Sequence, residues 1–586
     1  MDRRNFVKAA ALILPGAKLR ALALPRDPSA DAGDAPTPVG GDLAARYRLT
    51  LDRVLHGDAP AYSADFLLAD VKPQPVRRFT EYSGDLSGRY IGALATAARV
   101  YGQSFPGLDG LVASVVALQK QDGYFGAGFH YDHPTDDDLA LLWGNGRLLV
   151  GLLEYYRLKP APEVLASCRR LGDWLVRIGP LMLSAEIRAA FGAQHFASSY
   201  ICWMQQTEGL ANLYAVTKDE RYRTLAEQVA AVIELRPGDH VHGGLTSLRG
   251  VMDLHAATGD PRFLAQCETA WQYVAAGKDA LITGGVPEGW SPNNHRTEGC
   301  AEADWVRLSL ALWRATGKRQ YLEAGERAIF NELAFNQFAT GDFGHRLYTE
   351  TGLPQNGAAR AWWCCTLHGL RAFPDIHASV FRATQEGLWF DLPLYARIES
   401  GGLQAFSEST LGEDGTVRIT IASAGSGAAS LFIRKPDWAA SAEIHVAGKA
   451  RQFAAGEGYA GVERAWAAGD VIEVKYGMGL RQLAQGGDRV AYFYGPWLLG
   501  AAAVDNPATV NELTAGNRLV RGSERPQPAD RRRGGRFRVP IAATAATCIP
   551  AEFPDQPQTA ELRAIAEQTG QATTGWELRF LGDAKS

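Results

Sequence analysis

The sequence predicts a mixed multidomain protein in which an (α/α)6 barrel, a closed ring of helical hairpins, is followed by an antiparallel β-sandwich. Two observations support this prediction. Helical segments of one repeating plan fill the chain from about residue 85 to residue 380, and alternating apolar and polar residues replace them past about Gly387. At 586 residues, the chain is also too long for one simple core, so we expect two or three domains.

The N-terminus resembles a twin-arginine export signal. Arg3 and Arg4 precede an apolar run, Ala9 to Leu14, that is too short to cross a bilayer as a mature helix. We expect a signal peptide over residues 1–23, a flexible leader over residues 24–40, and a periplasmic or secreted protein that is not inserted in the membrane after export. An ordinary frayed N-terminus is the alternative.

The helical region contains three similar stretches, Leu213 to Val229, Leu254 to Ala270 and Leu312 to Ala328. Each has an apolar helix end, a threonine, a polar turn, and then an aromatic residue and a leucine that open the next helix. Such helix-turn-helix units must stack to bury their apolar stripes. An open solenoid would leave the same trace, but the regular plan favours the closed barrel, which we place at residues 41–385.

The β-rich region follows the barrel. Segments such as "VRITIASA", "AEIHVAGK" and "DVIEVKYGM" alternate apolar and polar residues between Gly, Asp and Asn turns, as strands of a β-sandwich do. We place this domain at residues 386–510. Residues 511–586 form a C-terminal extension to which we assign no fold and no chemistry, although its end is expected to add a strand and a helix.

Composition narrows the possible partners. The net charge is −4 and no long basic run occurs, which argues against a nucleic acid or an anionic membrane as partner. Aromatic residues make up 10% of the chain and include 14 Trp, a weak indication of a sugar-binding protein because indole faces stack on sugar rings.

The stretch "WWCCTLHG" places Cys364 and Cys365 side by side. Adjacent cysteines seldom form a disulfide with each other, so they are two core residues, halves of two separate bridges, or two ligands of one ion. Upstream, Glu298 and Cys300 are two positions apart, and three thiolates with one carboxylate suit tetrahedral zinc. The spacing is not that of a zinc finger, and the pattern alone leaves core residues and metal ligands equally open.

Longer stretches resemble glycoside hydrolase family 127, the bacterial β-L-arabinofuranosidases and their relatives. The resemblance rests on "TEGCAEADWVRLSL", "WWCCTLHGLRAF", "LFIRKPDW" and "GPWLLGA", and it extends from about residue 85 to residue 505. It implies an (α/α)6 barrel with β-sandwich domains, which agrees with the repeats and the change of period.

The resemblance also implies roles for particular residues. Cys364 would be a nucleophile bound to Zn²⁺, and Glu298, Cys300 and Cys365 would be the remaining zinc ligands. Glu288, in "GGVPEGW", lies in the loop where the family carries its acid/base glutamate, although an exposed loop glutamate is the alternative. The implied activity is that of a retaining exo-glycosidase on an oligo- or polysaccharide, with a thiolate in place of the usual carboxylate nucleophile.

Other positions bear on the substrate. Tyr348 matches a family tyrosine near the nucleophile, with a buried core tyrosine as the alternative. Arg147 and Thr246 stand where the family presents histidines to arabinose, and the "CCTLHG" turn places His368 near the metal. These departures suggest a different glycone, one with a carboxylate that Arg147 would bind through two hydrogen bonds.

Two further interpretations compete with the glycosidase. One is a polysaccharide lyase or unsaturated-uronyl hydrolase on the same barrel, in which the zinc is structural. The other is a non-catalytic carbohydrate-binding relative. The presence of Cys364, Glu298 and a nearby loop glutamate favours the glycosidase, because a protein that only binds sugar needs no such set.

Overall fold

The computed structural model describes most of the chain. The predicted signal peptide, and the predicted leader except for Gly40, lie outside the described residues. The described residues are 40–58, 60–72, 81–192, 199–276, 281–290, 296–348, 352–353, 360–400, 402–453, 456–485, 489–502, 505, 518–520, 527–528, 537–545, 556–567 and 576–581.

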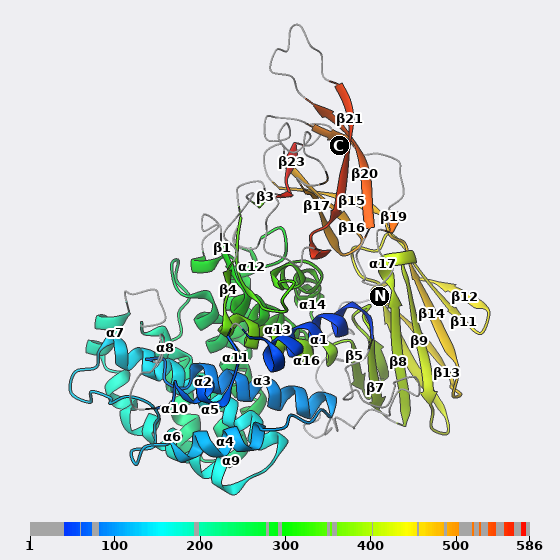
Figure 1. The fold of residues 1–586 in the computed structure, drawn as a ribbon. Helices are drawn as coiled ribbons and strands as arrows, with labels where there is room; N and C mark the ends of the chain where they lie inside the picture. The colour runs from blue at the N-terminus through cyan, green and yellow to red at the C-terminus, as the bar shows by residue number, and fades with distance from the viewer. Residues whose placement is uncertain are drawn as a thin grey trace. The chain divides into compact units, whose positions relative to one another are not determined.

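The chain forms two compact units, and Figure 1 labels many of their helices and strands. The first contains residues 58–277 and 304–325, and the second contains residues 39–57, 278–303 and 326–586. Within the described residues, the first unit is helical and the second holds all of the β-strands. No described helix has both the length and the apolar character that a membrane span requires.

The helices of the first unit pack on one another, and their apolar faces supply the core. The helices are α2 (Ala64–Leu68), α3 (Asp85–Tyr101), α4 (Leu108–Ala117), α5 (Asp136–Leu158), α6 (Pro162–Met182), α7 (Ala185–Phe191), α8 (Ile201–Met204), α9 (Gln206–Thr217), α10 (Glu220–Ala230), α11 (Val241–Thr258) and α12 (Pro261–Ala276), followed by most of α13 (Gly299–Thr316) and α14 (Arg319–Ala328). They pack both along the chain, as α9 does on α10, and across an intervening helix, as α3 does on α5.

The predicted repeats share one turn geometry. At the end of α9, the Thr217 hydroxyl donates to the Leu213 carbonyl at 2.7 Å and accepts from the Asp219 N–H at 3.3 Å. Thr258 at the end of α11 and Thr316 at the end of α13 make the same pair of bonds. In each repeat the threonine hydroxyl bonds a carbonyl group in the last helical turn and an N–H group in the connection that follows. This double role explains why threonine recurs at this position in the sequence.

The second unit begins with α1 (Gly41–His56) and continues with a three-stranded sheet of order β1-β2-β4. This sheet leads to the long helix α16, whose first residues carry the paired cysteines. The elements here are β1 (Arg296–Glu298), a π-helical turn η2 (Ile329–Leu333), α15 (Ala334–Asn336), β2 (Gly344–Leu347), β4 (Arg360–Ala361) and α16 (Trp363–His377).

Two sheets correspond to the predicted β-sandwich. Buried side chains alternate along their strands as expected; in β9 (Thr416–Ser423), for example, Val417, Ile419 and Ile421 are buried. The strand pairings are antiparallel except that β6 and β10 run parallel. One sheet has the order β13 (Tyr459–Ala465), β10 (Ala428–Arg434), β6 (Gly387–Phe390), β5 (Phe381–Thr384); the other has the order β12 (Lys449–Gln452), β11 (Ala442–Val446), β14 (Val471–Tyr476), β9 (Thr416–Ser423), β8 (Leu403–Thr410), β7 (Ala396–Ser400).

A ten-stranded sheet contains the described part of the C-terminal extension. Strands β20 (Phe537–Ala545) and β21 (Gln556–Ala564) pair over eight residues each and join β17 (Trp497–Ala502). In this part of the extension the only helical element is the short turn η3 (Ile565–Glu567). The other strands are β3 (Gly352–Leu353), β15 (Leu480–Ala484), β16 (Arg489–Tyr494), β18 (Arg518–Val520), β19 (Gln527–Pro528), β22 (Trp576–Glu577) and β23 (Phe580–Leu581).

The architecture of a helical barrel followed by antiparallel sheets confirms the predicted fold class. The predicted boundaries, at residues 41–385, 386–510 and 511–586, remain predictions.

Candidate metal centre and active site

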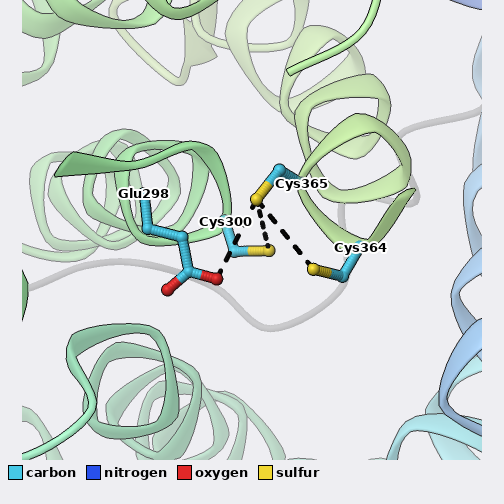
Figure 2. Close-up of side chains that lie close together, drawn as sticks. All are labelled: Glu298, Cys300, Cys364 and Cys365. Atoms are coloured by element: carbon cyan, nitrogen blue, oxygen red, sulfur yellow. Dashed lines mark hydrogen bonds between the residues drawn. The ribbon is translucent and has the colours of Figure 1, made fainter. Parts of the chain in front are cut away.

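Four residues of the second unit meet at one point. The Sγ atom of Cys365 lies 3.6 Å from Cys300 Sγ, 3.9 Å from Cys364 Sγ and 3.9 Å from Glu298 Oε1. One ligand atom from each of the four residues lies within 4.8 Å of all the others. Figure 2 shows these side chains directed toward one another from the end of β1 and from the starts of α13 and α16.

Local structure explains this convergence. Glu298 ends β1, and Cys300 is the second residue of α13, so both lie at one strand-to-helix corner. Cys364 and Cys365 lie in the first turn of α16. A β-carbon on Gly299 would be 2.7 Å from Asn336 Oδ1 and 3.1 Å from the Cys365 β-carbon, so only glycine lets the corner approach α16 this closely. Both helix N-termini favour negative charge on the sulfur atoms.

The donor set fits a tetrahedral metal ion. Sulfur ligands at the usual zinc distance are about 3.8 Å apart in a tetrahedron, close to the separations found here. Burial raises the pKa of the Cys300 and Cys365 thiols well above the usual range. Without a cation these thiols would therefore stay protonated, and a protonated thiol is a poor nucleophile. A bound metal ion would favour the thiolate form. Cys364 is less buried than Cys300 and Cys365, which leaves its sulfur the most accessible of the three.

Glu288 lies beside this cluster. It opens a 3-10 turn, η1 (Glu288–Trp290), and only 6% of its surface is exposed. Carboxylate oxygens of Glu288 and Glu298 lie within 4.8 Å of each other. The backbone turns sharply here, since Trp290 adopts a left-handed φ of 51° that is rare for a bulky residue. A buried carboxylate next to a candidate metal centre is a chemically suitable acid or base.

Tyr348 and His368 both belong to the second unit. The Tyr348 hydroxyl donates to Glu332 Oε2 at 2.5 Å. His368 is buried on α16, one turn after Cys364 and therefore on the same helix face. The sugar contacts predicted for both residues remain predictions.

Arg147 and Thr246 are in contact in the first unit. Arg147 Nη1 donates to Thr246 Oγ1 at 2.8 Å and forms an ion pair with Glu208 Oε2 at 2.9 Å. Arg147 is 2% exposed, and its Nε and Nη2 atoms make no hydrogen bond with a described residue. Glu208 Oε1 also lies 3.0 Å from Arg249 Nη2, so the Glu208 carboxylate forms ion pairs with two guanidinium groups.

A buried polar chain continues from Arg249. Arg249 Nη1 binds Asp304 Oδ1 at 2.8 Å, His242 Nδ1 lies 2.7 Å from Asp304 Oδ2, and Arg89 Nη2 lies 3.0 Å from His242 Nε2. A guanidinium has no acceptor, so Nε2 must accept and Nδ1 must carry the proton. The sequence offered no signal for this chain of side chains, because its four members come from three helices and each alone is an ordinary polar residue.

Two carboxylates near the centre were also not predicted. Glu302 of α13 accepts the Val286 N–H at 3.1 Å, and Glu332 of η2 accepts the hydroxyls of Tyr348 and Thr297. Both side chains are fully buried. Glu302 lies in the first turn of α13, two residues after Cys300, and this closeness in sequence is the one signal that could have placed it near the centre.

Comparison with known proteins identifies the family. The model of the β-L-arabinofuranosidase GH127 catalytic domain matches residues 72–378, and the model of the GH127 middle domain matches residues 392–478. A comparison with curated protein sequences gives no match.

Solved structures share the fold. A GH127 β-L-arabinofuranosidase from Geobacillus stearothermophilus T6 is 18% identical with a TM-score of 0.71, and the alignment covers 93% of this chain and 100% of that one. Another GH127 β-arabinofuranosidase is 16% identical with a TM-score of 0.70, covering 94% and 98%. The catalytic-domain model alone spans more than half of the chain. The protein therefore belongs to glycoside hydrolase family 127 and is a glycosidase.

Proposed function

We propose that the protein is a retaining exo-glycosidase in which Cys364 is the nucleophile, Glu288 is the acid/base, and Glu298, Cys300, Cys364 and Cys365 hold Zn²⁺. The observation that carries the proposal is the convergence of three sulfur atoms and one carboxylate, with a second carboxylate within 4.8 Å of the first. A bound zinc ion would keep the sulfur atoms as thiolates near neutral pH.

The chemistry of the chain then follows two steps. Cys364 Sγ attacks the anomeric carbon, and the bond to the leaving oxygen breaks as Glu288 donates its proton to that oxygen. This gives a thioglycosyl group on Cys364. Glu288, now a carboxylate, takes a proton from water as the water oxygen attacks the anomeric carbon, and the Cys364 thiolate leaves. Two displacements at one carbon retain its configuration.

The substrate is proposed to be a β-L-arabinofuranoside or a related glycoside with an acidic glycone. The acidic alternative is supported by Arg147, because Nε and Nη2 form the edge of a guanidinium that binds a carboxylate through two bonds. Both atoms are shielded from solvent, so a carboxylate reaches them only after neighbouring side chains move. We also propose twin-arginine export to the periplasm or beyond, which places the enzyme with extracellular glycans.

The test combines metal content with turnover. Wild type, Cys364→Ser and the control Cys168→Ser are assayed for zinc and on a panel of aryl glycosides; Cys168 is also buried but lies outside the cluster. We expect about one zinc per chain in the wild type and loss of turnover only in folded Cys364→Ser. Turnover retained by Cys364→Ser would refute the thiolate nucleophile and favour a lyase or uronyl-hydrolase mechanism with structural zinc.

A further inference from the structure

A buried carboxylate connects the elements that carry the proposed catalytic groups. Glu332 lies in the π-helical turn η2 and is fully buried. Isolated π-helical turns are uncommon and often occur at functional sites. Its neighbour Asn331 fixes this turn: the Asn331 amide donates to the Pro496 carbonyl at 3.0 Å and accepts the Leu498 N–H at 2.6 Å. Strand β17 and the turn before it therefore anchor the helical turn from which the Glu332 side chain extends.

Glu332 binds the strands of the metal centre through both of its oxygens. Thr297 Oγ1 donates to Oε1 at 2.9 Å, and the Tyr348 hydroxyl donates to Oε2 at 2.5 Å. Thr297 directly precedes Glu298 in β1, and Tyr348 directly follows β2, the partner of β1. Burial, and then the charge of Glu332, raises the pKa of Tyr348 well above its usual range. The hydroxyl consequently keeps its proton and remains a donor.

The same carboxylate supports the loop that carries Glu288. A β-carbon on Gly285 would collide with the Glu332 side chain and would lie 2.6 Å from Glu302 Oε2, so the loop backbone rests against both acids. The Val286 N–H, two residues before Glu288, donates to Glu302. Gly285 is thus required by close approach, because any larger residue would push the loop away from Glu332.

We infer that Glu332 is a positioning residue that holds the Glu288 loop and the Glu298 strand at a fixed separation. The inference rests on the roles proposed above for Glu288 and Glu298. A displacement of about 1 Å between a nucleophile and its acid/base can cost on the order of 100-fold in rate. A single buried carboxylate that touches both supporting segments is placed to prevent such a displacement.

The test uses Glu332→Gln and Tyr348→Phe, with Tyr459→Phe as the matched control. Tyr459 also donates to a buried carboxylate, Asp391 Oδ1, at 2.7 Å, but in the β-sandwich region. We expect each of the first two variants to lower kcat by about 10- to 100-fold with KM changed less than about twofold and zinc content unchanged. The double variant should be no slower than the slower single variant, because both changes break one contact. Tyr459→Phe should lower Tm and leave kcat unchanged.

A second readout does not depend on activity. Amide hydrogen exchange of the peptide covering residues 281–290 should become at least about tenfold faster in Glu332→Gln, while the peptide covering β9, Thr416–Ser423, should keep its wild-type rate. Unchanged exchange in residues 281–290, additive losses in the double variant, or kcat within about twofold of wild type would overturn the inference. Full activity of Cys364→Ser would instead refute the proposed function, and the exchange measurement would still decide the role of Glu332.

Discussion

The Sγ atoms of Cys300 and Cys365 lie 3.6 Å apart although 65 positions separate the two residues in the chain. Two contacts bring these sulfur atoms together: the β1–α13 corner packs against α16, and β2 pairs with both β1 and β4, the strand that leads into α16. Burial raises the pKa of both thiols, so without a metal ion they would be two neutral groups in contact. A bound cation would instead stabilise them as thiolates, which are metal ligands.

Metal removal should therefore expose these thiols chemically. Dialysis against a strong chelator is expected to abolish turnover. It should also make Cys300, Cys364 and Cys365 reactive with a thiol reagent, which raises the number of reactive cysteines by three relative to the metal-bound protein. The buried Cys168, Cys202 and Cys267 should react in neither form and provide the internal control. Added Zn²⁺ should restore both protection and turnover; a thiol count unaffected by the chelator would contradict a metal centre.

Glu288→Gln tests the acid/base role. An amide cannot donate the proton, so kcat/KM should fall by about 100- to 10,000-fold on glycosides with poor leaving groups and much less on those with good ones. Azide needs no deprotonation, so it should accelerate the second step and give a glycosyl azide with retained configuration. The matched control is Glu413→Gln, which changes an exposed carboxylate of the short helix α17 (Leu411–Asp414) that has no proposed role. Equal losses on both classes of leaving group would argue against Glu288 as the acid.

Much of the site was predictable because its signal is local. The Glu-x-Cys motif spans three residues at the β1–α13 corner, and the Cys-Cys pair lies within the first turn of α16. The Thr-turn repeats predict the helical hairpins for the same reason. Glu332 was not predictable, because its partner Thr297 is 35 positions away and the bond depends on how two elements pack. The ten-stranded sheet was missed because its strands pair far along the chain, as β17 does with β21.

Arg147→Gln tests the acidic glycone. Glutamine keeps a polar group but has no charge and no two-point edge for a carboxylate, so turnover of acidic glycosides should fall at least about tenfold more than turnover of neutral ones. Arg249→Gln is the comparison, since Arg249 binds the same Glu208 carboxylate. Equal losses on acidic and neutral glycosides would remove the substrate carboxylate from the proposal and leave Arg147 with a structural role as the partner of Glu208 and Thr246.

His377 predicts a pH dependence of stability. Burial lowers its pKa from 6.5 to about 4, while its Nδ1 atom donates to the Phe373 carbonyl at 3.0 Å. Between pH 6.5 and about 4 the unfolded chain binds a proton here and the folded chain does not, so stability falls as pH falls. From pH 7 to pH 5 the loss is about 2 kcal/mol.

The measurement is chemical unfolding of wild type and His377→Asn at both pH values. Asparagine keeps a donor for the Phe373 carbonyl but does not titrate, so the variant should lose about 2 kcal/mol less than wild type between pH 7 and pH 5. The same loss in both proteins would show that His377 titrates alike in the folded and unfolded states.

Arg434 and Glu326 form a buried two-point ion pair within the second unit. Arg434 Nη1 lies 3.0 Å from Glu326 Oε1 and Nη2 lies 3.1 Å from Oε2, with Nη1 also donating to the Asp391 carbonyl. Arg434→Met leaves the carboxylate buried without its cation, so the free energy of unfolding should fall by about 3–5 kcal/mol. The exposed pair Arg418 and Glu473, with Nε 3.0 Å from Oε2, is the control, and Arg418→Met should cost less than about 1 kcal/mol.

A double variant separates the ion pair from the packing around it. Glu326→Leu with Arg434→Met removes both charges together, so no ion is left buried and part of the lost stability should return. If the double variant is less stable than Arg434→Met alone, the apolar parts of the two side chains matter more than the charge left unpaired. Because Arg434 lies in the "RKPDW" stretch that carries the family resemblance, recovery in the double variant would give that motif a purely structural role in joining β10 to the end of α14.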